Sequence, residues 1–242
     1  MRPQHLPIEE IRFAARAGFL SKPIWDEFFA KGSDRWKRRQ WQLLQQRGYF
    51  VRHPSRLPRD VLVLYRGNPD VRKLVGETIA LPPIAPQIEH DECASRILLS
   101  LDRGGHVLGY QFEAEMKRLE WGERRLYRSA EKDKFPDAVL AVASPKGVMN
   151  VAMEVELSRK NPKRYRQILA SYAARKDLTY VIFLARSQVI FESLKMAMRQ
   201  TFYADWERPI GFCDLNSWLK DPARAPIYFS ERQTTLMQIT AS

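Results

Sequence analysis

Three carboxylates interrupt two otherwise apolar runs in the second half of the chain. Residues 137–144 and 150–157 read as the strands of a β-hairpin joined by a Pro-Lys-Gly turn. Side chains alternate between the faces of a strand, so Glu154 and Glu156 are expected on one face, about 6.5–7 Å apart. Asp137 enters the neighbouring strand and can reach the same point. Clustered oxygen ligands without His or Cys are typical of a Mg²⁺ or Mn²⁺ site, which the spacing therefore predicts.

A lysine follows these acids closely in the sequence. Lys160, or Lys163 on the next predicted helix, can stabilise the charge that develops on a phosphate under attack. The alternative is an amphipathic hairpin whose solvent-facing side is acidic. An acidic patch would repel nucleic acid, and a bound divalent metal would remove that conflict.

The charge of the chain is uneven. The net charge is +12, and residues 1–80 hold 16 Lys/Arg against 8 Asp/Glu, whereas the remainder holds 24 against 20. A localised basic region is the electrostatic footprint expected for a phosphate backbone. A generally basic, solvated surface is the alternative.

The basic region has the element order of a winged helix-turn-helix. Apolar spacing and capping residues predict helices over 7–20, 21–32 and 33–50, followed by two short strands around a basic, Pro-containing loop. In such a fold the third helix and the loop meet DNA. The predicted DNA-binding residues are Arg35, Lys37, Arg38, Arg39, Arg52, Arg56 and Arg59. The alternatives are a small helical domain with a solvated basic face and a winged helix used for protein contacts.

The predicted organisation is a winged-helix domain over 1–80, a Pro-rich linker over 81–90 and a second domain over 91–242. Within the second domain the patterns predict the order helix, three strands, helix, strand, helix. Besides the hairpin, the predicted elements are a helix at 91–105, a strand at 106–118 with a helix as the rival, a helix at 161–177, a strand at 178–185 and a helix at 187–202. The fold class expected is α+β or α/β.

The composition argues against a membrane or secreted protein. No apolar stretch approaches the roughly 18 residues of a membrane span, and the first residues lack an apolar signal core. The two cysteines, Cys93 and Cys213, have no metal-ligand spacing and are expected as free thiols. A cytoplasmic protein without a membrane partner is expected.

These motifs resemble those of the PD-(D/E)xK nuclease superfamily. The resemblance rests on the Pro-Asp pair at 136–137, the E-x-E at 154–156, the following lysine and the α-β-β-β-α-β order. The usual pattern has Lys two residues after the Glu, where this chain has Glu156. In this superfamily the lysine can migrate onto the next helix.

The wider arrangement resembles the replication-relaxation family, which includes MobC-type relaxases and pairs a winged helix with a PD-(D/E)xK-like domain. The resemblance rests on GYF at 48–50, His90, PDAVL, MEVELSRK and Tyr172. It implies DNA nicking or binding at a transfer or replication origin of a plasmid or mobile element, with accessory mobilisation or replication proteins as partners. It also implies an extra acidic metal ligand at Glu92, with Asp91 as an equally placed rival.

Histidine and tyrosine are two further residue types that could act as catalytic groups. His90 is interpreted as a helix cap or a core hydrogen-bonding residue more readily than as a base. Tyr165 or Tyr172 could act as a covalent nucleophile, although Tyr172 fits a core position on its predicted helix better.

The leading hypothesis is a metal-dependent DNA nickase or endonuclease. Asp137 and Glu154 would hold the metal, Glu156 would assist through water or a second ion, and Lys160 would stabilise the transition state. The substrate would be duplex DNA or a melted origin. One alternative is a non-catalytic DNA-binding regulator, or initiator accessory protein, with a degenerate nuclease fold. Another is a protein–protein adaptor.

Overall fold

The structure, a computed structural model, describes residues 6–52, 58, 60–76, 79–119, 135–173, 175–201, 209–229 and 232–241. The chain divides into two compact units, residues 1–95 and 96–242, and the boundary falls within helix α5 (Ile88–Arg103). The Pro-rich segment 81–90 contains a short 3₁₀ turn, η2 (Ala85–Gln87), and then the start of α5. None of the helices in the described ranges is long and apolar enough to cross a membrane.

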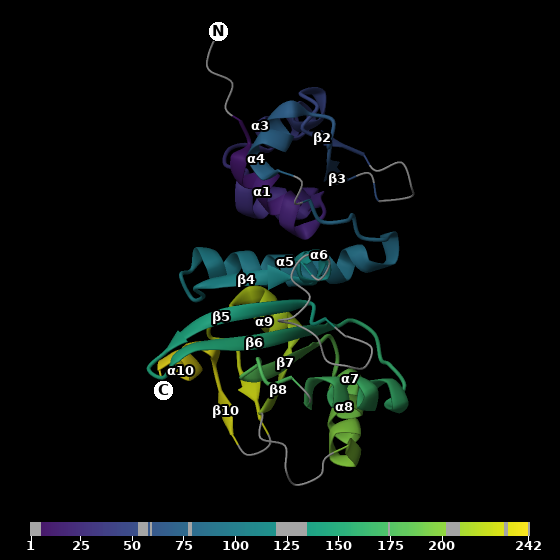
Figure 1. The fold of residues 1–242 in the computed structure, drawn as a ribbon, viewed down its shortest axis with the longest axis vertical. Helices are drawn as coiled ribbons and strands as arrows, with labels where there is room; N and C mark the ends of the chain where they lie inside the picture. Colours follow the sequence, from purple (N-terminus) through teal and green to yellow (C-terminus); the bar gives the residue numbers. More distant parts are fainter. Residues whose placement is uncertain are drawn as a thin grey trace. The chain divides into compact units, whose positions relative to one another are not determined.

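The first unit combines short helices with a three-stranded antiparallel sheet in the order β1-β3-β2 (Figure 1). Its elements are α1 (Ile8–Ala17), β1 (Leu20–Ser21), α2 (Lys22–Ile24), the π-helical η1 (Trp25–Phe29), α3 (Asp34–Gln46), β2 (Phe50–Val51), β3 (Val61–Leu64) and α4 (Pro69–Val75). The three predicted helices and the two predicted strands are present. The second helix is α2 continued by η1, and the sequence analysis did not identify β1 or α4.

Local sequence explains where α3 begins and what it buries. The Ser33 hydroxyl accepts a hydrogen bond from the Trp36 backbone N–H at 3.3 Å, which caps the helix. Trp41 and Leu44 are buried in the unit, and the Trp41 ring lies 5.5 Å from the Trp25 ring. One face of α3 therefore fixes the helix to the unit and leaves the opposite face to solvent.

The second unit is built on a seven-stranded mixed sheet in the order β10-β9-β8-β7-β6-β5-β4. Strands β4, β5 and β6 are antiparallel neighbours, and β6, β7 and β8 are parallel neighbours. After α5 the elements are β4 (Gly109–Phe112), α6 (Glu113–Leu119), β5 (Ala138–Ser144), β6 (Gly147–Glu156), α7 (Pro162–Ala173), β7 (Tyr180–Ala185), α8 (Gln188–Thr201), β8 (Ile210–Asp214), α9 (Leu215–Lys220), β9 (Ile227–Tyr228), β10 (Gln233–Thr234) and α10 (Leu236–Ala241). The predicted mixture of helices and strands is confirmed at this level.

The segment predicted as one strand at 106–118 divides into β4 and α6. The Glu115 carboxylate accepts a hydrogen bond from the Phe112 backbone N–H at 3.0 Å, which caps α6 at the residue where the strand ends. Both rival interpretations are therefore partly right. Every element after α8 lies beyond the last element that the sequence analysis named.

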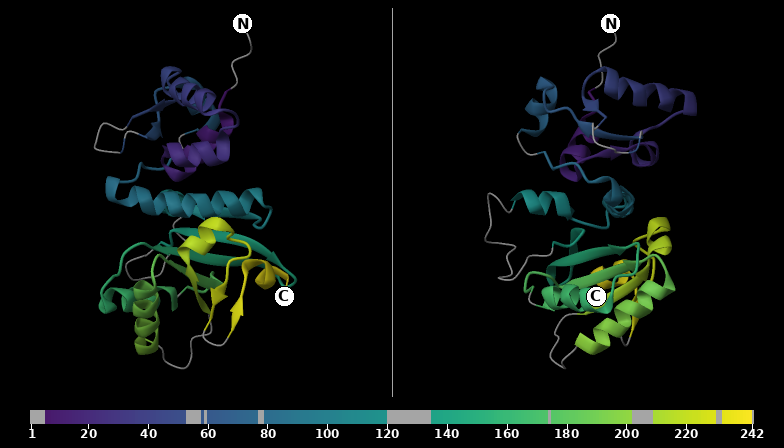
Figure 2. Two further views of the ribbon diagram at one scale, coloured as in Figure 1. Left: turned by 180° about the vertical axis from the view of Figure 1, so that it is seen from behind. Right: turned by 90° about the vertical axis from the view of Figure 1, so that its right-hand side faces the viewer.

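Helices cover both faces of the sheet. α7 and α8 pack side by side over one face (Figure 2). Their buried side chains form a hydrophobic cluster with Ala152, Phe183 and Phe212 of the strands. On the opposite face Trp218 of α9 and Cys213 of β8 are buried. Side chains on both faces of β6 are consequently buried.

Candidate functional site

The two glutamates of β6 point into the interior beneath α7. Glu154 is 1% exposed and Glu156 is 0% exposed, and they share a strand face with Ala152 of the hydrophobic cluster. The predicted alternation is therefore confirmed. The alternative of a solvent-facing acidic side is wrong, because α7 covers that face. Charged groups are rarely buried this completely without partners, so what they contact decides their role.

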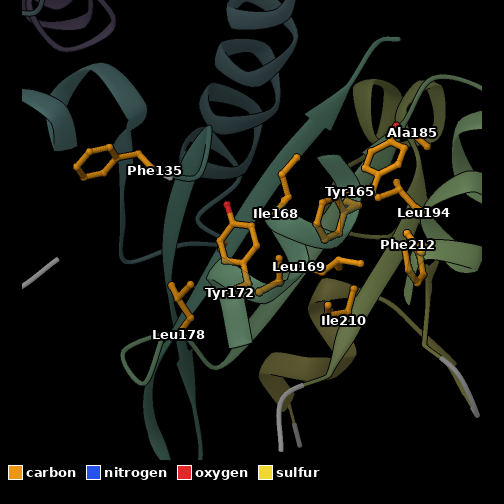
Figure 3. Close-up of a cluster of buried hydrophobic side chains, with 14 of the residues drawn as sticks. Phe135, Tyr165, Ile168, Leu169, Tyr172, Leu178, Ala185, Leu194, Ile210 and Phe212 are labelled. Carbon is orange, nitrogen blue, oxygen red and sulfur yellow. The ribbon is translucent and has the colours of Figure 1, made fainter. Parts of the chain in front are cut away.

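Two tyrosines of α7 lie over these two glutamates. Tyr165 and Tyr172 are seven residues apart, or two helical turns, so they share one buried face of α7 (Figure 3). The Tyr172 hydroxyl donates a hydrogen bond to Glu154 Oε1. Burial raises the pKa of Tyr172 well above 10.0, and the neighbouring Glu154 carboxylate raises it further.

Asp137 converges on Glu154. Ala138 pairs with Met153 in the antiparallel ladder, so the residue before the strand lies opposite Glu154. Asp137 Oδ2 accepts a hydrogen bond from the Val155 backbone N–H at 2.6 Å. The Asp137 charge also contributes to the raised pKa of Tyr172, which Arg175 opposes, so both carboxylates lie near the same hydroxyl.

Glu156 belongs to a second group of contacts. Lys160 Nζ donates a hydrogen bond to Glu156 Oε2, and the Lys160 backbone N–H donates to the Tyr165 hydroxyl at 3.1 Å. Burial raises the pKa of Tyr165, the hydrogen bond from Lys160 lowers it, and the Glu156 charge raises it. The Lys160 side chain stays 35% exposed, so the cation reaches solvent while its partner does not. Lys163, the other candidate lysine, is exposed on α7.

Asp137 and Glu154 are the two predicted metal ligands that lie at neighbouring positions, just before β5 and on β6. Mg²⁺ typically takes one or two carboxylates from a protein and completes its shell with water and substrate phosphate oxygens. Asp137 and Glu154 supply such a pair. In the ranges that the structure describes, no group of three or more His, Cys, Asp or Glu side chains is arranged to hold a metal. Glu156, the third predicted ligand of the hairpin, is engaged by Lys160 instead.

The other predicted acid belongs to the first unit. Glu92 is half-buried on the N-terminal half of α5. Beside it, His90 Nδ1 and Asp91 Oδ1 form a hydrogen bond of 3.0 Å. His90 is the third residue of α5, so it pairs with its neighbour rather than capping the helix.

The tyrosines are poor candidates for a covalent nucleophile. Tyr165 is 0% exposed and Tyr172 is 1% exposed, and both belong to the cluster under α7. Their raised pKa values keep both hydroxyls protonated near neutral pH. The core interpretation of Tyr172 is confirmed, and its hydroxyl serves Glu154.

We expect Tyr172→Phe to lower the free energy of unfolding by about 1–3 kcal/mol, because the buried Glu154 carboxylate loses a donor. The folded-state pKa of Tyr172 is raised, so its contribution is complete below pH 10.0 and is lost as the pH rises above it. The wild type should therefore lose more stability between pH 9 and 11 than the variant. Urea unfolding across that range measures both effects.

Tyr228→Phe is the matched control, because Tyr228 is 40% exposed. It should shift the unfolding midpoint little at any pH. An equal effect of the two substitutions would show that the Tyr172 hydroxyl contributes nothing through Glu154.

The predicted DNA-binding residues differ in whether their side chains are exposed to solvent. Arg35, Arg38 and Arg39 are exposed on α3, and Arg52 is exposed just after β2. Lys37 turns inward, because its Nζ donates to the Asp26 backbone carbonyl at 3.1 Å. Arg56 and Arg59 lie outside the described residues.

Sequence reasoning missed two side chains on α3. Gln42 and Gln46 are exposed on the helix that carries the arginines. Gln42 lies seven residues after Arg35, and Gln46 lies seven residues after Arg39. This spacing was the signal that could have identified them, because it places side chains on one helix face.

Comparison with known proteins adds no relative. No protein-family model, no curated protein and no solved structure matches this chain. Two features of the molecule therefore indicate its function. One is the pair of carboxylates Asp137 and Glu154, with the neighbouring Glu156–Lys160 pair, and the other is the exposed basic face of α3.

Proposed function

We propose that the protein is a metal-dependent DNA endonuclease that nicks one strand. The observation that carries the proposal is the convergence of Asp137 and Glu154 at the end of a β-hairpin, with the Lys160 ammonium held on the same side of the strand by Glu156. A divalent cation held by the two carboxylates would supply an activated water and neutralise phosphate charge. Lys160, partly exposed, would contact the phosphate oxygens.

The connectivity of the second unit supports this proposal. α5 is followed by β4, by the short helix α6 and then by β5 and β6, and the three strands are antiparallel neighbours. α7 then crosses over to β7, which is parallel to β6. Apart from α6, this order resembles the α-β-β-β-α-β order of the PD-(D/E)xK superfamily. Asp137 precedes the second of these strands and Glu154 lies on the third.

The first unit would bring DNA to that site. Its helices and antiparallel hairpin fit a winged helix, in which α3 enters the major groove. The exposed arginines of α3 and Arg52 carry charge that suits the phosphate backbone. A transfer or replication origin on a plasmid or mobile element, with accessory proteins that melt it, is the proposed substrate.

The full-length chain, incubated with supercoiled plasmid and Mn²⁺, should convert it to open circles rather than to linear DNA. One active site per chain cuts one strand, which is the reason to expect nicking. Gel electrophoresis over time measures the products, and a single-stranded origin substrate removes any need for a helper. EDTA should stop the reaction. Tight binding without cleavage under any divalent metal would contradict the nuclease proposal.

That contrary outcome would favour a non-catalytic DNA-binding regulator or accessory protein. One observation supports this second candidate: Glu154 and Glu156 are buried and already engaged by Tyr172 and Lys160. Such internal pairs can hold α7 on the sheet without any chemistry. The two candidates share the DNA-binding unit and differ only in what the carboxylates do.

A further inference from the structure

The exposed face of α3 carries a straight ridge of four hydrogen-bonding side chains. Arg35, Arg39, Gln42 and Gln46 stand at positions i, i+4, i+7 and i+11, and all four are exposed. The helix buries Trp41 and Leu44 on the other side, so its orientation on the unit is fixed. The ridge thus presents two guanidinium groups followed by two carboxamides to solvent.

The ridge side chains are not committed to the protein's own fold. Within the described residues, no ion pair or side-chain hydrogen bond engages Arg35, Arg39, Gln42 or Gln46. Lys37, on the same helix, shows the contrast, because it donates to the Asp26 carbonyl. The one acid of α3, Asp34, precedes the ridge and lies off it. The ridge is therefore available to a partner that offers acceptors to arginine and paired donor and acceptor groups to glutamine.

Base edges in the DNA major groove offer this combination. Arg makes a bidentate pair with guanine O6 and N7, and Gln makes one with adenine N6 and N7, whereas phosphate contacts need only positive charge. Eleven helical residues span about 16 Å, which corresponds to roughly five base-pair steps. Glutamine contributes no charge to backbone binding, so its presence at two ridge positions favours base reading over backbone binding.

We propose that α3 reads DNA sequence directly, with Arg35 and Arg39 selecting guanine and Gln42 and Gln46 selecting adenine. The inference rests on the DNA-binding part of the proposed function and is independent of cleavage. It assigns the two glutamines to specificity and leaves the general attraction to DNA with the exposed basic side chains. The protein would then recognise a short site in which guanine and adenine positions are adjacent.

Selection from a library of randomised duplexes with the full-length chain tests this proposal. The wild type should enrich a motif with guanine and adenine positions, and Gln42→Ala/Gln46→Ala should lose the adenine preference. Affinity for the enriched duplex should fall by on the order of a hundredfold in that variant. The salt dependence of binding to random duplex should stay unchanged, because no charge is removed.

Gln40→Ala is the matched control, because Gln40 is a half-buried glutamine of the same helix off the ridge. It should keep the wild-type motif, and circular dichroism should show equal helix content in all three proteins. Salt-dependent binding of random duplex without any enriched motif would overturn base reading and leave DNA binding intact. Retention of the adenine preference in the double variant would overturn the assignment of the glutamines. An absence of any duplex binding would overturn the DNA-binding proposal itself.

Discussion

In Glu154→Gln, metal-dependent nicking is expected to fall by at least about a hundredfold, while affinity for DNA is unchanged. Glutamine keeps the volume of the side chain and can still accept from the Tyr172 hydroxyl, but it lacks the charge that holds a divalent cation. Loss of a group that merely orients a metal ligand costs about 10- to 100-fold, so loss of a ligand should cost at least as much. Nicking rates and binding isotherms at saturating Mn²⁺ measure the two properties.

The control for charge removal is Glu192→Gln on the exposed surface of α8. It should nick like the wild type. Mn²⁺ should also raise the melting temperature of the wild type and of this control, because binding to the folded state alone stabilises it. In Glu154→Gln and Asp137→Asn the same ion should raise it far less. Equal melting shifts in all four proteins would remove Asp137 and Glu154 as a metal site.

The hairpin that carries the acids was predictable because strand alternation is a local property. The Pro-Lys-Gly turn joins β5 and β6. Side chains on a strand alternate between its two faces, so Glu154 and Glu156 are assigned to one face before any tertiary contact is known. The pairing of that face with α7 was not predicted. It depends on the crossover that places Tyr172 and Tyr165 over the strand, and two glutamates in a strand ordinarily indicate a solvent-facing side.

Other elements were missed because their sequences carry too little periodicity. β1 has two residues and is defined by pairing with β3 from far along the chain, so no local pattern marks it. The strand expected at 106–118 ends early because the Glu115 side chain caps a helix there. The role of Glu156 was also not predictable from the sequence. A glutamate on a strand can bind a metal or pair with a lysine, and only the structure shows that the Lys160 ammonium contacts Glu156.

Lys160→Met is expected to cost about 3 kcal/mol in the free energy of unfolding. The substitution leaves the Glu156 carboxylate 0% exposed without the ammonium that it contacts, and breaking a buried pair from one side costs about 3–5 kcal/mol. The lower end of this range of free energies is expected because the Lys160 side chain is partly exposed to solvent. Lys163→Met, three residues on and exposed, should stay within about 0.5 kcal/mol of the wild type. Urea denaturation of the three proteins measures the difference.

Replacing both members of the Glu156–Lys160 pair by uncharged residues separates a structural role of the pair from a catalytic one. Glu156→Gln/Lys160→Met removes the buried charge together with its partner, so most of the lost stability should return. If Lys160 contacts the scissile phosphate, the stable double variant should still nick poorly, because no cation has been returned to the site. Wild-type nicking by the double variant would make the pair a purely structural contact between β6 and the loop before α7. Failure of the second substitution to restore stability would show that the carboxylate charge is not what destabilises Lys160→Met.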